Sequence, residues 1–201
     1  YFDEVEIDER RVSEEKMDLL VRVKEARTGE FKFGAGYGSY GGVSGNVAVS
    51  DRNVLGSGIQ GTASIDISQK SSLYKLSIFN PRFNDSRYSL GGSVYRSKYQ
   101  AYDYTQTTTG FDVTVGRQLT RNWHAYMTYE LSNTELSDIT ANTTATFDKY
   151  YHGNKYSKSA VRPGVTYNTT DDYLLPRRGI TENTYVEYAG LGGDAEFIKN
   201  Y

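Results

Sequence analysis

Alternation of apolar and polar residues with a period of two is the feature of this sequence that most restricts its fold. In residues 31–38 aromatic residues and alanine occupy the odd positions, and lysine or glycine occupies the even positions. Successive side chains of a β-strand point to opposite faces, so this period gives a strand with one apolar and one polar face. The alternation recurs along the chain and predicts an all-β fold for residues 29–201.

Nine segments with this pattern are predicted as strands. Two of them, 59–68 and 123–131, are close to the roughly 9–11 residues that a tilted strand needs to cross a bilayer. Pro163 interrupts the eighth segment, because proline lacks the N–H that a continuous ladder requires. The predicted strands are 31–38, 43–50, 59–68, 74–78, 88–98, 111–115, 123–131, 161–167 and 181–188.

The composition favours a membrane barrel over a soluble sandwich. The chain has 19 Tyr and 20 Gly but only 3 Pro, and tyrosine collects where hydrocarbon meets lipid headgroups. A barrel strand needs apolar residues only on its lipid face, so a barrel can be polar on average. We therefore expect part of a transmembrane antiparallel β-barrel. Aromatic residues that could form an interfacial belt, or pack in a sandwich, are Trp123, Tyr126, Tyr129, Tyr150 and Tyr151.

The predicted connections differ between the two ends of the strands. Short connections follow the even-numbered segments at 53–58, 84–87, 121–122 and 177–179, whereas the connection at 133–157 is long and polar. Short turns at one rim and a long loop at the other are typical of outer-membrane barrels. The run 148–156 is interpreted as a surface loop.

Residues 1–28 differ from the rest of the chain. Segments 5–7 and 17–23 are predicted as short strands joined by the charged run 8–16, and the composition changes at 26–29. This pattern resembles the exit from a small soluble domain. The chain begins with Tyr1 rather than Met, so we expect a piece of a longer protein without its targeting peptide.

Charge and residue types exclude several classes of function. The net charge of −2 provides no excess of cations for a phosphate backbone, so no nucleic-acid partner is expected. Cysteine is absent, which excludes disulfides, thiolate metal sites and thiol catalysis. Gly36, Gly38 and Gly41 fit the dinucleotide pattern G-x-G-x-x-G, but that pattern needs a following helix, and residues 43–50 are strand-like.

No catalytic, metal or cofactor site is predicted. His124 and His152 lack the spacing of metal ligands and are interpreted as solvated or lumen-side residues. Asp171 and Asp172 precede a turn, where aspartate commonly accepts hydrogen bonds from its own backbone. The sequence also lacks a G-x-S-x-G nucleophile motif, so we do not expect an enzyme.

Longer motifs resemble the Omp85 superfamily of outer-membrane barrels and, within it, the BamA branch. The resemblance covers nearly the whole chain and rests on YFDEVEI at 1–7, FKFGAGYGSYGGVSGNVAVSDRNVLGSG at 31–58, NPRF at 80–83, SLGGSVY at 89–95, LPRRG within 174–179 and VEYAGLGGD at 186–194. It implies that residues 1–28 end a periplasmic POTRA domain. Residues 29–201 would then begin a barrel of about sixteen strands. The family's late-loop Arg-Gly motif lies beyond Tyr201 and carries over to no residue here.

The resemblance also implies a function, the folding and insertion of other outer-membrane proteins. In the family the first barrel strand pairs with the last, and this seam is thought to open so that a client strand can add to the edge. The implied partners are unfolded outer-membrane β-barrel clients, accessory lipoproteins of an assembly complex and outer-membrane lipid. The implied location is the outer membrane, with the N-terminal residues in the periplasm. The candidate seam comprises Phe31, Lys32, Phe33, Gly34, Ala35, Gly36, Tyr37 and Gly38.

Other readings of the same residues stay open. The glycines of the first strand weaken it by entropy and lost packing, but they could equally permit tight curvature of the barrel. A two-partner secretion pore of the same superfamily would pass one polypeptide through its lumen. A passive porin is disfavoured because strands precede the barrel, and a lipid-modifying hydrolase is disfavoured because no nucleophile and base are found together.

Overall fold

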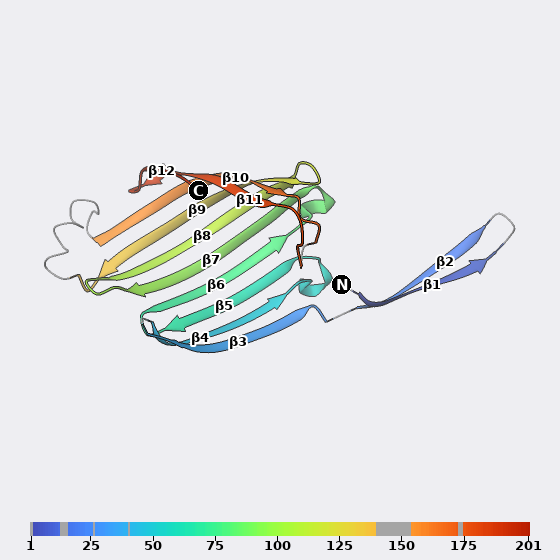
Figure 1. Cartoon of the computed structure of the whole chain (residues 1–201), viewed down its shortest axis with the longest axis horizontal. Coiled ribbons are helices and arrows are strands. Elements are labelled where there is room, and N and C mark those ends of the chain that lie inside the picture. The colour runs from blue at the N-terminus through green and yellow to red at the C-terminus, as the bar shows by residue number, and fades with distance from the viewer. Residues whose placement is uncertain (1, 13–15, 26, 40, 140–153, 173–174) are drawn as a thin grey trace.

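A computed structural model describes residues 2–12, 16–25, 27–39, 41–139, 154–172 and 175–201 of the chain. In this part the strands form two separate antiparallel sheets. The smaller sheet is a hairpin of β1 (Phe2–Arg11) and β2 (Met17–Glu25), which extends away from the larger sheet (Figure 1). Among the described residues, no helix has the length and hydrophobicity needed to cross a membrane.

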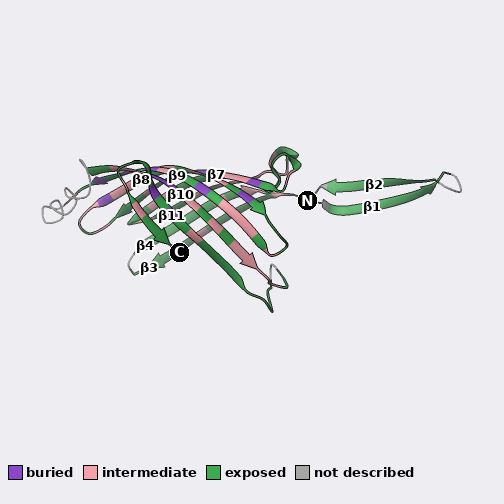
Figure 2. Cartoon of the chain, turned by 90° about the horizontal axis from the view of Figure 1, so that it is seen from above, coloured by how far each residue is buried: buried purple, intermediate pink, exposed green. Residues whose placement is uncertain are grey.

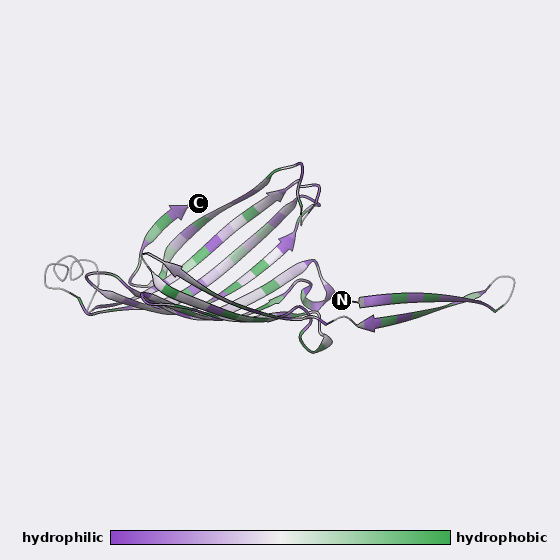
Figure 3. Ribbon diagram, turned by 60° about the horizontal axis from the view of Figure 1, so that its bottom comes forward, coloured by the Kyte–Doolittle hydropathy of each residue, from purple (hydrophilic) through white to green (hydrophobic). Residues whose placement is uncertain are grey.

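The larger sheet is a meander of ten strands in which each strand pairs with its neighbours in the chain. It curves like part of a barrel wall (Figure 3). Two short 3-10 turns, η1 (Val54–Gly56) and η2 (Phe83–Asp85), join strands at the end where the β1–β2 hairpin leaves (Figure 1). The strands are β3 (Gly29–Gly38), β4 (Gly42–Asp51), β5 (Gln60–Ser68), β6 (Ser71–Asn80), β7 (Tyr88–Gln100), β8 (Thr105–Gln118), β9 (Trp123–Ser137), β10 (Lys155–Asn168), β11 (Thr181–Gly193) and β12 (Phe197–Asn200). The predicted nine strands are confirmed, and β12 is the start of a tenth.

Strand ends differ from the sequence prediction in three places. β9 runs to Ser137 and β10 begins at Lys155, so the predicted loop 133–157 is shorter, and its residues 140–153 lie outside the described part. The connection from β10 to β11 covers residues 169–180 and is longer than the turn predicted at 177–179. Residues 2–11 and 17–25 form longer strands than predicted, because the first four residues of the charged run, 8–11, continue β1.

The predicted interruption at Pro163 is only partly correct. The ladder between β10 and β9 is continuous and pairs Pro163 with Met127. The register with β11 goes from Val161 to Gly164 and omits the two residues between them. A missing N–H removes a bond toward one neighbouring strand only, so the proline lies inside β10 without ending it.

The distribution of side chains is the reverse of that in a soluble domain. Three described hydrophobic residues are buried, against nine polar or charged ones, and all of them belong to β7–β11 (Figure 2). Large hydrophobic side chains are exposed instead, for example Phe33 at 79% and Val94 at 53%. Each strand therefore has an apolar face that needs a cover other than water, and a polar face on which side chains cover one another.

The apolar band runs obliquely across the strands. The band has a limit at the end of the sheet away from η1 and η2, marked on each strand by its last apolar residue. The cross-strand register shows how far this residue is offset from the corresponding residue of the next strand. From β4 to β11 this limit moves by about eight residues, or roughly 27 Å along the strands, while it crosses seven strand spacings, or roughly 34 Å. The implied strand tilt is about 40°, which membrane barrels share. The limiting residues are Val43, Ile67, Tyr74, Val94, Phe111, Leu131, Val161 and Tyr188.

Candidate functional site

β3 is an edge strand whose only partner in the described part of the chain is β4. Ten residue pairs join the two strands, from Gly29 opposite Asp51 to Gly38 opposite Gly42. In an antiparallel pair, alternate residues direct their N–H and C=O groups away from the partner. The predicted seam residues 31–38 therefore lie on one edge of the sheet, where alternate residues have no backbone partner among the residues that the structure describes.

The two faces of β3 are unequal. Phe31, Phe33 and Tyr37 are 64%, 79% and 81% exposed on the apolar face, and the rings of Phe31 and Phe33 lie 6.2 Å apart. On the polar face, Lys32 pairs with Glu30 at 3.2 Å, and the remaining positions to residue 38 are glycines. One face of β3 therefore carries large apolar side chains, and the other face carries few side chains.

The glycines of β3 have different surroundings. A β-carbon at Gly34 would meet the side-chain amide of Asn46, whereas one at Gly38 would meet nothing within 4 Å. At Gly36 the hydroxyl of Ser44 donates to the backbone carbonyl at 3.3 Å, which is a side-chain link between β3 and β4. Space alone therefore does not account for all three glycines, and the lack of packing at Gly38 supports a weak edge.

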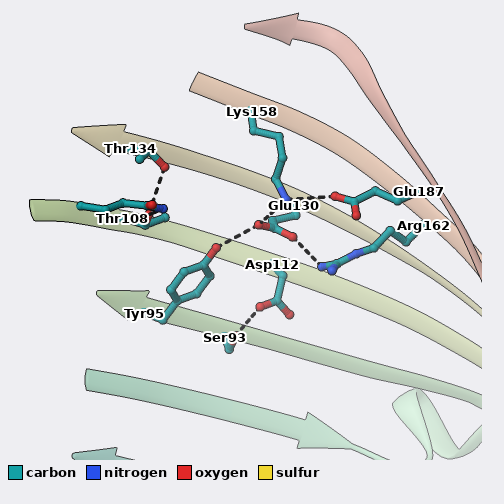
Figure 4. A network of polar contacts seen from close by, with 10 residues as sticks. Ser93, Tyr95, Thr108, Asp112, Glu130, Thr134, Lys158, Arg162 and Glu187 are labelled. Atoms are coloured by element: carbon teal, nitrogen blue, oxygen red, sulfur yellow. Dashed lines mark hydrogen bonds and ion pairs between the residues drawn. The ribbon is translucent and has the colours of Figure 1, made fainter. Parts of the chain in front are cut away.

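Strands β7–β11, by contrast, are joined by a buried polar network (Figure 4). Glu130 on β9 accepts hydrogen bonds from the Tyr95 hydroxyl at 2.9 Å and from Lys158 at 3.0 Å, and its other oxygen pairs with Arg162 at 2.7 Å. Lys158 also contacts Glu187 on β11 at 3.0 Å. The two carboxylates are only 8% and 6% exposed, so each charge depends on its partners.

Smaller contacts extend this network along the same face. The Ser93 hydroxyl donates to Asp112 between β7 and β8. Threonine pairs join β8 to β9, with hydroxyl oxygens 3.0 Å apart for Thr108 and Thr134. Side chains therefore reinforce the backbone ladder from β7 to β11, whereas the described part of β3–β6 relies mainly on the ladder itself.

Sequence reasoning missed the charged residues of this network. A signal was present, because Glu130, Lys158, Arg162 and Glu187 fall at polar positions of adjacent alternating segments. Their register was not predictable from one sequence, so the convergence of four charges on one point could not be foreseen. Within the described residues, no group of three or more acidic or histidine side chains is arranged to hold a metal ion.

The motifs considered as ligand sites have structural roles. Gly36, Gly38 and Gly41 lie in and beside the β3–β4 hairpin, with a strand after them instead of the helix that a phosphate loop needs. His124 lies on the polar face, and its ring is 6.2 Å from that of Tyr126. His152 lies outside the described residues.

The predicted aspartate turn is confirmed. Asp171 accepts hydrogen bonds from the backbone N–H groups of Arg177 and Arg178 at 2.9 and 3.1 Å, and Asp172 accepts one from Leu175 at 2.9 Å. These backbone donors favour the charged form, so they lower the pKa of the Asp171 carboxyl below its ordinary value. These hydrogen bonds join Asp171 and Asp172 to residues 175–178 within the connection between β10 and β11.

The aromatic residues divide between the faces. Trp123 packs against Tyr167 at 4.7 Å between ring centroids, and Tyr129 lies on the same apolar face. Tyr126 belongs to the polar face, where its hydroxyl donates to Asn183 at 2.9 Å, so its assignment to an interfacial belt was wrong. Tyr150 and Tyr151 lie outside the described residues.

Comparison with known families agrees with this architecture. Residues 53–201 match the Omp85 superfamily domain. The chain belongs to the Omp85 superfamily. This Omp85 chain is also 34% identical over 194 residues to the outer membrane protein assembly factor BamA of Nitratidesulfovibrio vulgaris, covering 92% of the chain and 24% of that protein. The BamA of Neorickettsia risticii is 29% identical over the entire chain and 27% of its own length.

A solved structure confirms the fold of this Omp85 chain. The crystal structure of BamA from Haemophilus ducreyi lacking POTRA domains 1-3 superimposes with a TM-score of 0.79 at 22% sequence identity, over 96% of this chain and 40% of that one. The predicted fold, part of a transmembrane antiparallel β-barrel, and the BamA-like resemblance are therefore confirmed. The chain spans about a quarter of the length of these curated relatives.

Proposed function

We propose that this chain is part of an outer-membrane protein assembly factor that folds and inserts other β-barrels at the free edge of β3. The observation that carries the proposal is the contrast within the sheet. Within the described residues β3 pairs with β4 alone and has no buried side chain, whereas β7–β11 are held by the network around Glu130. The names of the BamA relatives support the same role.

The physical task is to bring polar backbone groups into lipid. Each unsatisfied N–H or C=O in hydrocarbon costs several kcal/mol, so a client strand cannot enter alone. The edge of β3 supplies hydrogen-bond partners for one strand at a time, and backbone pairing accepts many client sequences. The reaction needs no covalent chemistry, nucleotide or metal in this account.

The arrangement also supports an orientation. The β1–β2 hairpin leaves the sheet at the end that carries η1 and η2 (Figure 1), and short turns face the periplasm in outer-membrane barrels. Residues 1–28 would then be periplasmic and would end a POTRA domain. The partners in this proposal are unfolded barrel clients, accessory lipoproteins and outer-membrane lipid.

Cysteine crosslinking in the full-length protein tests the edge. Phe33→Cys or Tyr37→Cys should crosslink to a cysteine in the terminal strand of a stalled client. Met127→Cys, which is also exposed on the apolar face but lies in the middle of the sheet, should not. Crosslinks of equal yield at all three positions, or none at Phe33 and Tyr37, would contradict templating at β3.

Depletion separates the two functions that the superfamily resemblance allows. Loss of an assembly factor should lower the amounts of many barrels in the outer membrane. Loss of a two-partner secretion pore should stop the export of one polypeptide and leave the other barrels in place.

A further inference from the structure

Two shallow depressions on the apolar face meet at one arginine. The larger has a volume of about 800 Å³ and is lined mainly by apolar side chains such as Val94 and Phe111. The second, of about 510 Å³, is lined mainly by polar ones. Arg96, Thr109 and Asn133 line both depressions. We infer that together they bind a phosphorylated glycolipid, with Arg96 and Lys98 holding its phosphate.

The depressions straddle the limit of the apolar band. On β7, β8 and β9 the apolar face changes character within one step of the register. The cross-strand row of Val94, Phe111 and Leu131 is followed, toward the end away from η1 and η2, by the row of Arg96, Thr109 and Asn133. Acyl chains and a polar headgroup divide at such a limit in a bilayer.

The cations at this limit are available to a ligand. Arg96 and Lys98 are two residues apart on β7, so they share a face. Both are exposed, and neither side chain has an ion pair or hydrogen bond with any part of the chain that the structure describes. By contrast, Lys155 pairs with Glu135 at 3.1 Å, and Arg117, near the opposite limit of the band, donates to a tyrosine hydroxyl at 3.0 Å.

The chemistry of the two cations fits phosphate. A guanidinium offers a planar pair of donors that matches phosphate oxygens, and lysine adds a point charge. Basic side chains near a bilayer surface attract anionic lipids, and their long stems can lie on the apolar band while the charge reaches the headgroup. Arg96 and Lys98 extend from that band at the level where a phosphate would lie.

The lining beyond the cations favours a sugar. Thr107, Thr109 and Asn133 bring hydroxyl and amide groups to the polar depression, whose two carboxylates already have partners: Glu135 pairs with Lys155, and Asp194 accepts from Ser157 at 3.1 Å. Hydroxyl and amide groups hydrogen-bond sugar hydroxyls, whereas a simple phospholipid headgroup would leave most of them unused. A glycolipid that carries phosphate on its sugars, as lipid A does, satisfies the cations, the polar lining and the apolar depression together.

In the orientation of the proposed function, this site lies at the outer leaflet of the membrane. That assignment rests on the proposed function, whereas lipid binding by the protein in detergent can be measured independently of it. The full-length protein is purified in detergent and titrated, with native mass spectrometry as readout, against lipid A, fully dephosphorylated lipid A and phosphatidylglycerol. The test variant is R96Q/K98Q. The control is Arg117→Gln, which removes an exposed cation near the opposite limit of the apolar band and lies in the lining of neither depression.

We expect lipid A to bind the wild type and the control alike. R96Q/K98Q should bind lipid A at least about tenfold more weakly, because charge-assisted hydrogen bonds are lost. The wild type should bind dephosphorylated lipid A more weakly by the same factor. Retention of the unheated, fast-migrating band in electrophoresis checks that the variant is folded. Unchanged binding by R96Q/K98Q overturns the site, and equally tight phosphatidylglycerol binding overturns the glycolipid. A protein inactive in assembly can still pass this test, so the two proposals fail separately.

Discussion

Replacing Glu130 with glutamine should destabilise the barrel by about 2–3 kcal/mol, because the buried carboxylate that pairs with the partly buried Arg162 and Lys158 is removed. Glu130 pairs with Arg162 at 2.7 Å and Lys158 at 3.0 Å, and its side chain is 8% exposed. Removing one member of a fully buried pair costs about 3–5 kcal/mol. The expected cost is lower here because Lys158 keeps Glu187 at 3.0 Å and Arg162 is 27% exposed.

Glu135 provides a matched control on the same strand. Its ion pair with Lys155 has a similar distance, 3.1 Å, but the two side chains are 57% and 70% exposed. Exposed pairs contribute less than about 1 kcal/mol, so Glu135→Gln should be close to neutral. Urea unfolding of the full-length protein in detergent, followed by loss of the fast-migrating folded band, measures both variants. Equal midpoints for the two variants would refute the claim that the network reinforces β7–β11.

Two further predictions concern the edge strand and a connection. Gly38→Val should stabilise β3 by about 0.5–1 kcal/mol, since a β-carbon there meets nothing within 4 Å, and it should slow the appearance of other barrels in a depletion and complementation assay. Gly110→Val should destabilise instead, because its β-carbon would lie 2.8 Å from neighbouring side chains; faster assembly with Gly38→Val would contradict a weak seam. Asp171 has a lowered pKa in the folded state because of the N–H groups of Arg177 and Arg178, so its contribution is complete above the ordinary carboxyl pKa and is lost as pH falls through the lowered value. Hydrogen exchange of residues 175–180 should therefore be protected at neutral pH and lose protection in strong acid, and Asp171→Asn should remove the protection at neutral pH; an identical pH profile in Asp171→Asn would show that another group orders the turn.

Local chemistry made much of the fold predictable. Alternation located all nine long strands, because each side chain of a strand faces either the apolar or the polar side of the sheet, whichever strands lie beside it. The turn at Asp171 was predictable for a similar reason, since an aspartate bonds backbone groups only a few residues away. Tyr126 was considered for an interfacial belt but lies on the polar face, because aromatic character alone does not specify which side of a strand a residue occupies.

Period two and composition by themselves determined the class of fold and the number of long strands, whereas the seam at residues 31–38 came from the family resemblance and stays a prediction. Only the tertiary structure decided which strands are reinforced, because the pairing of Glu130 with Lys158 and Arg162 depends on the register of adjacent strands. The slant of the apolar band and the meeting of two depressions at Arg96 have the same origin. Alternation is a property of one strand, whereas register joins residues that the chain separates by a hairpin, and a single sequence does not record it.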